Sequence, residues 1–207
     1  MMHIWELIMD HIFPPSTEEL LIRKANIEDM KNEYSPSQKS SVYFLSYYKR
    51  KLIKSAITTA KFSHNKKSIS LLATLLGIWL TEHTKGGVLL IPIPLHYKRE
   101  RERGYNQVSR VLDKIQLENV RVSIAIIKRN RATPPQTTLT KNKRTKNLTG
   151  AFTININNLK HILTPEIKQI IICDDVYTTG STLAEAYKVL KPHVPKNCKL
   201  TCLAWAH

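Results

Sequence analysis

The sequence predicts an α/β domain in which a mainly parallel sheet is flanked by helices. Apolar segments of strand length alternate along the chain with segments whose apolar residues recur every three to four positions. Parallel neighbours need crossover connections, usually helices, so this alternation favours a parallel sheet. The length of 207 residues is slightly more than an average domain needs, which predicts one domain and a short appendage.

The appendage is expected at the N-terminus. Met1–Phe13 is predicted to form a short amphipathic helix, which Pro14 and Pro15 end because they lack backbone donors. A polar stretch follows, and its last residues are rich in turn formers. We therefore predict an N-terminal helix and linker over residues 1–40 and the main domain over residues 41–207.

The main domain begins with two helices. Residues 49–61 place apolar side chains on one face and lysines on the other, which predicts a surface helix, and residues 68–80 predict a more buried one. Gly86 and Gly87 then lead into a strand over residues 88–93, followed by a charged loop. The remaining predicted elements are a helix over 108–115, strands over 122–127 and 167–173, a helix beginning near residue 183, and a last strand carrying Cys198 and Cys202.

Basic residues dominate the composition. Lys and Arg number 32 against 16 Asp and Glu, which gives a formal charge of +16. The bases fall in blocks, with no acid between Glu33 and Glu82 or between Glu118 and Glu166. This pattern favours a polyanionic partner, either nucleic acid or a phosphorylated ligand.

The three cysteines indicate a reducing compartment. They form neither a paired CxxC framework nor a four-ligand zinc set, so core packing is the simplest role for all three. The N-terminus lacks the cationic start of a secretory signal, and the longest apolar run, Leu71–Leu80, is far short of the roughly 20 residues that cross a bilayer. We therefore expect a cytoplasmic protein without membrane insertion.

The loop after the strand 167–173 carries the clearest chemistry. Two acids, Asp174 and Asp175, lead into a turn of small and hydroxylated residues, and a helix follows. The first helical turn presents unpaired N–H groups and the positive end of the helix dipole, which favour an anion. Hydroxyls donate to phosphate oxygens, and glycine lets the backbone approach them. The predicted phosphate site is Val176, Tyr177, Thr178, Thr179, Gly180, Ser181 and Thr182.

The adjacent acids point to a sugar or a metal-bound ligand. Asp174 and Asp175 repel each other, so a partner with vicinal hydroxyls or a cation would offset that cost. The alternative is that the hydroxyl residues only start the helix, since Thr182 and Glu185 have capping-box spacing. That alternative accounts for Thr182 but not for two carboxylates at the end of a buried strand.

Residues 170–182 resemble the phosphoribosyl pyrophosphate motif of type I phosphoribosyltransferases. The resemblance implies the type I phosphoribosyltransferase fold with a flexible hood. It also implies that Asp174 and Asp175 hold ribose hydroxyls, that residues 176–182 wrap the 5'-phosphate, and that Mg²⁺ accompanies the phosphoribosyl pyrophosphate.

Three further segments narrow the resemblance to the ComF family of competence-associated proteins, over about residues 42–206. They are Ile91–His96 with Arg103–Gln107, the hood-like stretch 129–152, and Ala60-Lys61-Phe62. By this resemblance Arg103, Arg129 and Arg144 would stabilise the pyrophosphate. His96 could also touch a phosphate, although a lone histidine is as often a polar loop residue.

Simpler roles remain open for other basic residues. Residues 128–146 hold seven bases and no acid, which predicts an exposed, mobile loop that could close over a pyrophosphate. Its lysines Lys141, Lys143 and Lys146 could equally be solvated surface residues. The bases of residues 98–103 alternate with Glu100 and Glu102 and could form ion pairs on a turn.

The sequence departs from the family at its N-terminus. Many ComF relatives carry a four-cysteine zinc module after a Phe-Pro-Pro start, and here Phe13-Pro14-Pro15 is followed by no cysteine through Ser40. We therefore predict no zinc site and no other protein-bound metal site.

Three functions fit these observations. The first is a ComF-like protein that handles single-stranded DNA in natural transformation and binds a phosphoribosyl pyrophosphate-like ligand. The second is an active phosphoribosyltransferase of nucleotide metabolism, for which the sequence identifies no acceptor pocket. The third is a non-catalytic sensor of phosphoribosyl pyrophosphate.

Overall fold

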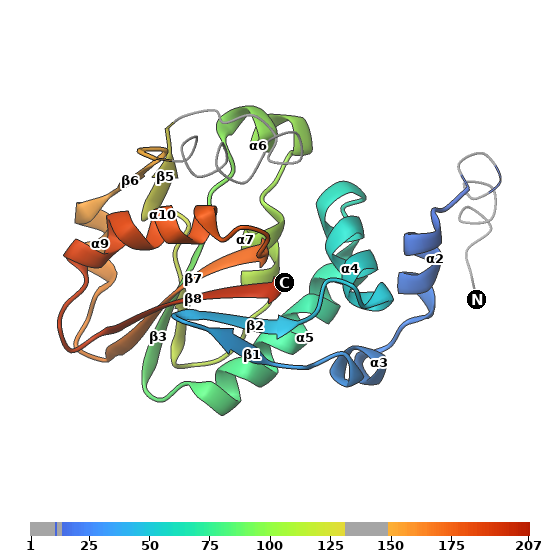
Figure 1. Ribbon diagram of the computed structural model, residues 1–207, viewed down its shortest axis with the longest axis horizontal. Helices are drawn as coiled ribbons and strands as arrows, with labels where there is room; N and C mark the ends of the chain where they lie inside the picture. Colours follow the sequence, from blue (N-terminus) through green and yellow to red (C-terminus); the bar gives the residue numbers. More distant parts are fainter. Residues whose placement is uncertain (1–10, 12–13, 131–148) are drawn as a thin grey trace.

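The computed structural model describes residue 11 and residues 14–130 and 149–207. A six-stranded sheet has the order β1-β2-β8-β7-β3-β4, in which every neighbouring pair is parallel except β1 and β2 (Figure 1). The predicted α/β class is therefore confirmed. The strands are β1 (Ser37–Lys39), β2 (Val42–Ser46), β3 (Gly87–Pro92), β4 (Val120–Val122), β7 (Ile167–Val176) and β8 (Lys199–Ala206).

Helices cover both faces of this sheet. Helices α4 (Lys51–Phe62), α5 (Lys66–His83) and α7 (Gln107–Leu112) share one hydrophobic cluster, and α10 (Ser181–Leu190) covers the opposite face (Figure 1). Strand β7 contributes Ile171 and Cys173 to the first cluster and Ile170 and Ile172 to the second. Because both faces are buried, the strand is continuously apolar rather than alternating.

A small second sheet lies beside the main one. It pairs β5 (Ile127–Arg129) with β6 (Phe152–Ile154) in antiparallel fashion. These strands flank the predicted hood, whose residues 131–148 lie outside the described part of the chain. Helix α9 (Ile156–Ile162) follows, and the short helix η2 (Lys191–His193) follows α10.

Residues 16–40 differ from the predicted polar linker. They contain α2 (Thr17–Lys24), α3 (Ile27–Asn32) and β1, and the side chains of Ile22 and Met30 are completely buried in the cluster of α4 and α5. Both helices begin with a capping box, at Ser16 and at Asn26. Apart from residue 11, the predicted helix over residues 1–13 lies outside the described residues.

Two elements of the middle region also differ from the prediction. The charged loop after β3 contains helix α6 (Tyr97–Arg103), which ends at Gly104 in the left-handed conformation with φ of 79°. The strand predicted over 122–127 is divided, because β4 ends at the edge of the large sheet and β5 begins in the small one. The other predicted helices and strands are present with shifted ends.

The three cysteines agree with their expected role in core packing. Cys173, Cys198 and Cys202 are free thiols buried in the core, and burial raises the pKa of each. Such thiols act as packing residues rather than nucleophiles. In the described part of the chain, no helix has the length and apolar character to cross a bilayer.

Candidate functional site

A cavity of about 360 Å³ lies at the carboxyl ends of β3 and β7. In open α/β sheets this is the edge where ligands bind. Segments far apart in the sequence form its walls: the end of α4, helices α6 and α7, strand β5, and the loop from β7 to α10. Its walls include Lys61, Arg99, Arg103, Gln107, Arg129, Asp174, Asp175, Val176, Tyr177, Thr178, Thr179, Gly180 and Thr182.

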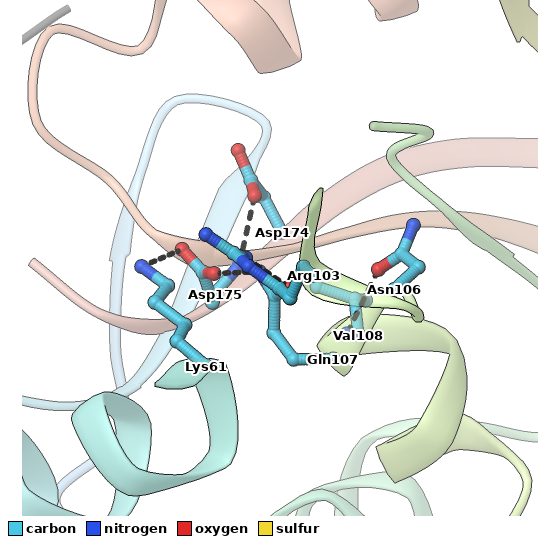
Figure 2. Close-up of polar contacts among 7 residues, drawn as sticks. All are labelled: Lys61, Arg103, Asn106, Gln107, Val108, Asp174 and Asp175. Atoms are coloured by element: carbon cyan, nitrogen blue, oxygen red, sulfur yellow. Dashed lines mark hydrogen bonds and ion pairs between the residues drawn. The ribbon is translucent and has the colours of Figure 1, made fainter. Parts of the chain in front are cut away.

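The carboxylate of Asp175 is held from two sides (Figure 2). Its Oδ1 lies 2.9 Å from Nζ of Lys61, and its Oδ2 accepts a hydrogen bond from Nε2 of Gln107. Nη1 of Arg103 in turn donates to Oε1 of Gln107 over 2.6 Å. Helices α4, α6 and α7 therefore all contribute to the position and charge compensation of one acid.

Asp174 lies in a different environment from its neighbour. Its Oδ1 accepts the backbone N–H of Asp175 at 2.9 Å. Burial, and then the charge of Asp175, raise the pKa of Asp174 to about 7, although Lys61 and Arg129 oppose the shift. A carboxyl group with this pKa changes its charge near neutral pH, which is typical of functional sites.

The turn between β7 and α10 presents a helix N-terminus to the cavity. Gly180 is the N-cap residue, with a left-handed φ of 74° and no side-chain cap. A Cβ atom at this position would overlap the ring of Tyr177, which packs edge-on against Phe44 with ring centroids 5.1 Å apart. The glycine therefore permits both the turn and the close approach of the tyrosine.

The capping-box interpretation of Thr182 is wrong. The N-cap is Gly180, so Thr182 lies inside the first turn of α10. The carboxylate of Glu185 instead accepts the backbone N–H of Gly150 at 2.7 Å, which joins α10 to the segment before β6. The hydroxyls of Thr179 and Ser181 lie 2.9 Å apart and share a hydrogen bond.

Three arginines, Arg99, Arg103 and Arg129, line the cavity near the acids. Burial lowers the pKa of Arg103 and of Arg129, while Asp175 and Asp174 respectively act in the opposite direction. A guanidinium stays charged despite such shifts because its ordinary pKa exceeds 12. The cavity thus combines a carboxylate pair with a cluster of permanent cations, which suits a ligand with hydroxyls and several phosphate oxygens.

Two predicted residues do not line the cavity, and one cannot be placed. Ser181 is buried and bonded to Thr179. His96 is buried as the N-cap of α6, where its Nδ1 accepts the N–H of Lys98 at 3.3 Å. Burial, followed by the charges of Arg129 and Lys98, lowers the pKa of His96, which favours the neutral acceptor form that a cap requires. Arg144 lies outside the described residues.

Three residues of the cavity wall, Lys61, Arg99 and Gln107, were not among those predicted for the site. Lys61 and Gln107 lie within segments that resemble the ComF family, and this resemblance could have identified them as site residues. Arg99 belongs to an alternating charged run that indicates a solvated turn equally well. Their place in the cavity depends on how α4, α6 and α7 pack, so local sequence patterns could not establish it.

The donors around the cavity determine whether Mg²⁺ fits there. Among the described residues no cluster of three or more histidines, cysteines and acids could form a metal cage. Mg²⁺ needs only one or two carboxylates when ligand phosphates supply other oxygens. Asp174 and Asp175 meet that requirement, so the residues fit an ion that arrives with a diphosphate.

The sheet order, the two acids at the end of β7 and the turn that follows define a type I phosphoribosyltransferase fold. The family model described as the phosphoribosyl transferase domain matches residues 103–207, and the chain belongs to this family.

Two curated relatives indicate the branch within the family. Competence protein F of Haemophilus influenzae is 36% identical over 109 residues, which cover 49% of this chain and 43% of that protein. The DNA utilization protein YhgH of Escherichia coli O6:H1 is 29% identical over 149 residues, which cover 69% of this chain and 63% of that protein. The matched stretches thus span 43% and 63% of these relatives, less than two thirds of either, and they confirm the ComF-family assignment.

Proposed function

We propose that this chain binds a phosphoribosyl pyrophosphate-like ligand in the cavity and handles single-stranded DNA in natural transformation, as a cytoplasmic ComF-like protein. One observation supports the ligand most directly. The carboxylate pair, the helix N-terminus and the three arginines line one cavity at the carboxyl edge of the sheet.

Each wall suits one part of such a ligand. Asp174 and Asp175 accept hydrogen bonds from the vicinal ribose hydroxyls, and the turn of residues 176–182 binds the 5'-phosphate through backbone N–H groups and hydroxyls. Arg99, Arg103 and Arg129 neutralise the pyrophosphate. Bound Mg²⁺ would neutralise part of the diphosphate charge.

The proposed role in DNA uptake combines the relatives with the charge of the chain. The names of the two relatives refer to competence and to DNA utilization. The formal charge of +16 suits a partner with a phosphate backbone.

Ligand binding is tested by calorimetric titration of the full chain with phosphoribosyl pyrophosphate and Mg²⁺. The affinity is compared with that for ribose 5-phosphate. Arg103→Ala is expected to weaken phosphoribosyl pyrophosphate binding about tenfold, because it removes a charge-assisted contact. It should change ribose 5-phosphate binding much less, since that ligand lacks the pyrophosphate. If neither compound binds to the unchanged protein, the proposed ligand is wrong.

Binding of DNA is tested by fluorescence anisotropy with a labelled oligothymidine at several salt concentrations. The affinity is expected to fall steeply with salt, with a log–log slope of about −0.7 for each phosphate neutralised. An affinity that is insensitive to salt, or no binding at low salt, would contradict the DNA-handling part of the proposal.

Phosphoribosyl transfer is the second candidate function. The arginines near the acid pair favour it, because they could stabilise the negative charge of a departing pyrophosphate. The reaction joins a nitrogen acceptor to C1 of the ribose and releases pyrophosphate. Pyrophosphate release with any purine or pyrimidine base would establish it, whereas ligand binding without release across the panel would favour a sensor.

A further inference from the structure

A second, cationic groove lies beside the candidate ligand site. It has a volume of about 360 Å³, and its walls come from the segment between α4 and α5, from the start of α5, and from helix α7 with its flanks. Lys66, Arg110 and Lys114 contribute three exposed cations against one acid, Asp113. Among the described residues none of these three cations has an ion pair or hydrogen bond from its side chain to another residue.

Aromatic rings stand among these cations. The rings of His64 and Tyr105, both in the groove wall, lie with centroids 4.2 Å apart, and the hydroxyl of Tyr105 donates to the carbonyl of Ala60. Tyr105 therefore fixes the end of α4 against the start of α7. His64 remains exposed beside it.

Phe62 adds an exposed ring between the two cavities. Its side chain is 70% exposed, and the guanidinium carbon of Arg103 lies 5.1 Å from the ring centroid. An exposed ring of this kind, which already carries a cation, is available to stack on a base.

The same two segments form both cavities. Along the end of α4, Lys61 faces the ligand cavity, Phe62 is exposed, and His64 lines the groove. In the opposing segment, Arg103 lines the ligand cavity and Tyr105 lines the groove. Phe62 and Arg103, which contact each other, lie in these two segments next to residues of both cavities, and we call this pair the ridge.

We propose that this groove and ridge bind single-stranded DNA, an inference that rests on the DNA-handling part of the proposed function. Lys66, Arg110 and Lys114 contact successive phosphates, and Phe62 stacks on one base. Cationic grooves interspersed with aromatic side chains recognise single strands in this way, because every unpaired base can stack on an aromatic ring. In a duplex the faces of the bases are covered by neighbouring base pairs. The strand consequently passes the mouth of the phosphoribosyl site.

The test is fluorescence anisotropy of the full chain with labelled oligothymidine and with a duplex of equal length. The double variant Arg110→Ala and Lys114→Ala is expected to reduce the magnitude of the salt slope by about 1.4, at 0.7 per lost phosphate contact. Phe62→Leu is expected to weaken oligothymidine binding about tenfold, as for one lost stacking contact, and to leave duplex binding unchanged.

A matched control separates this inference from general charge effects. Lys160→Ala and Lys188→Ala also remove two exposed positive charges, but they lie on α9 and α10. The inference is overturned, and the proposed function stands, if the control pair lowers the slope as much as the groove pair or if Phe62→Leu binds normally. If the unchanged protein binds no oligothymidine, both this inference and the DNA-handling part of the proposed function are wrong. Titration with phosphoribosyl pyrophosphate verifies that the groove variants remain folded.

Discussion

Replacement of Gly180 by valine is expected to abolish ligand binding while the rest of the fold persists. Gly180 has a φ of 74°, a conformation that costs a β-branched residue on the order of 1–2 kcal/mol. A Cβ atom would also overlap the ring of Tyr177, so either this ring or the turn would have to shift. Because this turn presents the first N–H groups of α10 to the cavity, its displacement removes the proposed phosphate contacts.

Calorimetry and thermal unfolding together test this result. The variant should show no measurable heat with phosphoribosyl pyrophosphate at concentrations that saturate the unchanged protein, and a moderately lower Tm. Gly77→Ala is the control, since Gly77 lies within α5 and nothing approaches within 4 Å of an added Cβ. This change should raise stability by about 0.5–1 kcal/mol and leave binding unaltered. Normal binding by Gly180→Val would show that the turn does not hold the ligand.

The turn and the acid pair could be predicted from sequence because the pattern is local. A buried strand, two acids, small residues and an amphipathic helix follow one another within residues 170–190, and the structure has that order. The hydrogen bond from Gln107 to Asp175 joins residues 68 positions apart, so only the packing of α7 on the sheet reveals it. Lys61 reaches Asp175 in the same indirect way from α4.

The missed helices have a different cause. Helix α6 contains no buried residue, so it offers no apolar periodicity to detect. Helices α2 and α3 bury only Ile22 and Met30 respectively, and their short patterns resemble a polar linker. Their capping boxes were readable in the sequence and would have predicted both starting points.

Asp174→Asn is expected to stabilise the protein at pH 8 and to weaken ligand binding about 10- to 100-fold. The folded-state pKa of Asp174, about 7, is above its ordinary value of 3.8. The folded state therefore retains the proton between these values, and the contribution of Asp174 to stability falls as pH rises from about 4 to 7 and is then constant. Asparagine avoids the cost of this part-buried charge, so the variant should gain on the order of 2 kcal/mol at pH 8 and roughly a third of that at pH 5.

The affinity for the ligand should rise with pH, whereas the contribution of Asp174 to stability falls. Ribose hydroxyls donate to the carboxylate, so the affinity of the unchanged protein for phosphoribosyl pyrophosphate should rise with pH up to about 7, where Asp174 becomes charged. An asparagine cannot gain that charge, and the loss of a hydrogen bond to a charged group costs about 1.5–3 kcal/mol. The ratio of the two affinities should therefore grow as pH rises, while phosphate ionisation, which both proteins share, cancels.

Paired denaturant unfolding and calorimetry at pH 5 and pH 8 measure both effects. A gain in stability together with a loss of affinity at pH 8 would mean that the buried charge is maintained for the ligand at the expense of the fold. If Asp174→Asn instead lowers stability at pH 8, the carboxylate stabilises the empty protein through Lys61 and Arg129, and folding does not raise its pKa. If affinity is unchanged while stability rises, Asp174 lies in the cavity wall without touching the sugar, and Asp175 alone would hold the hydroxyls.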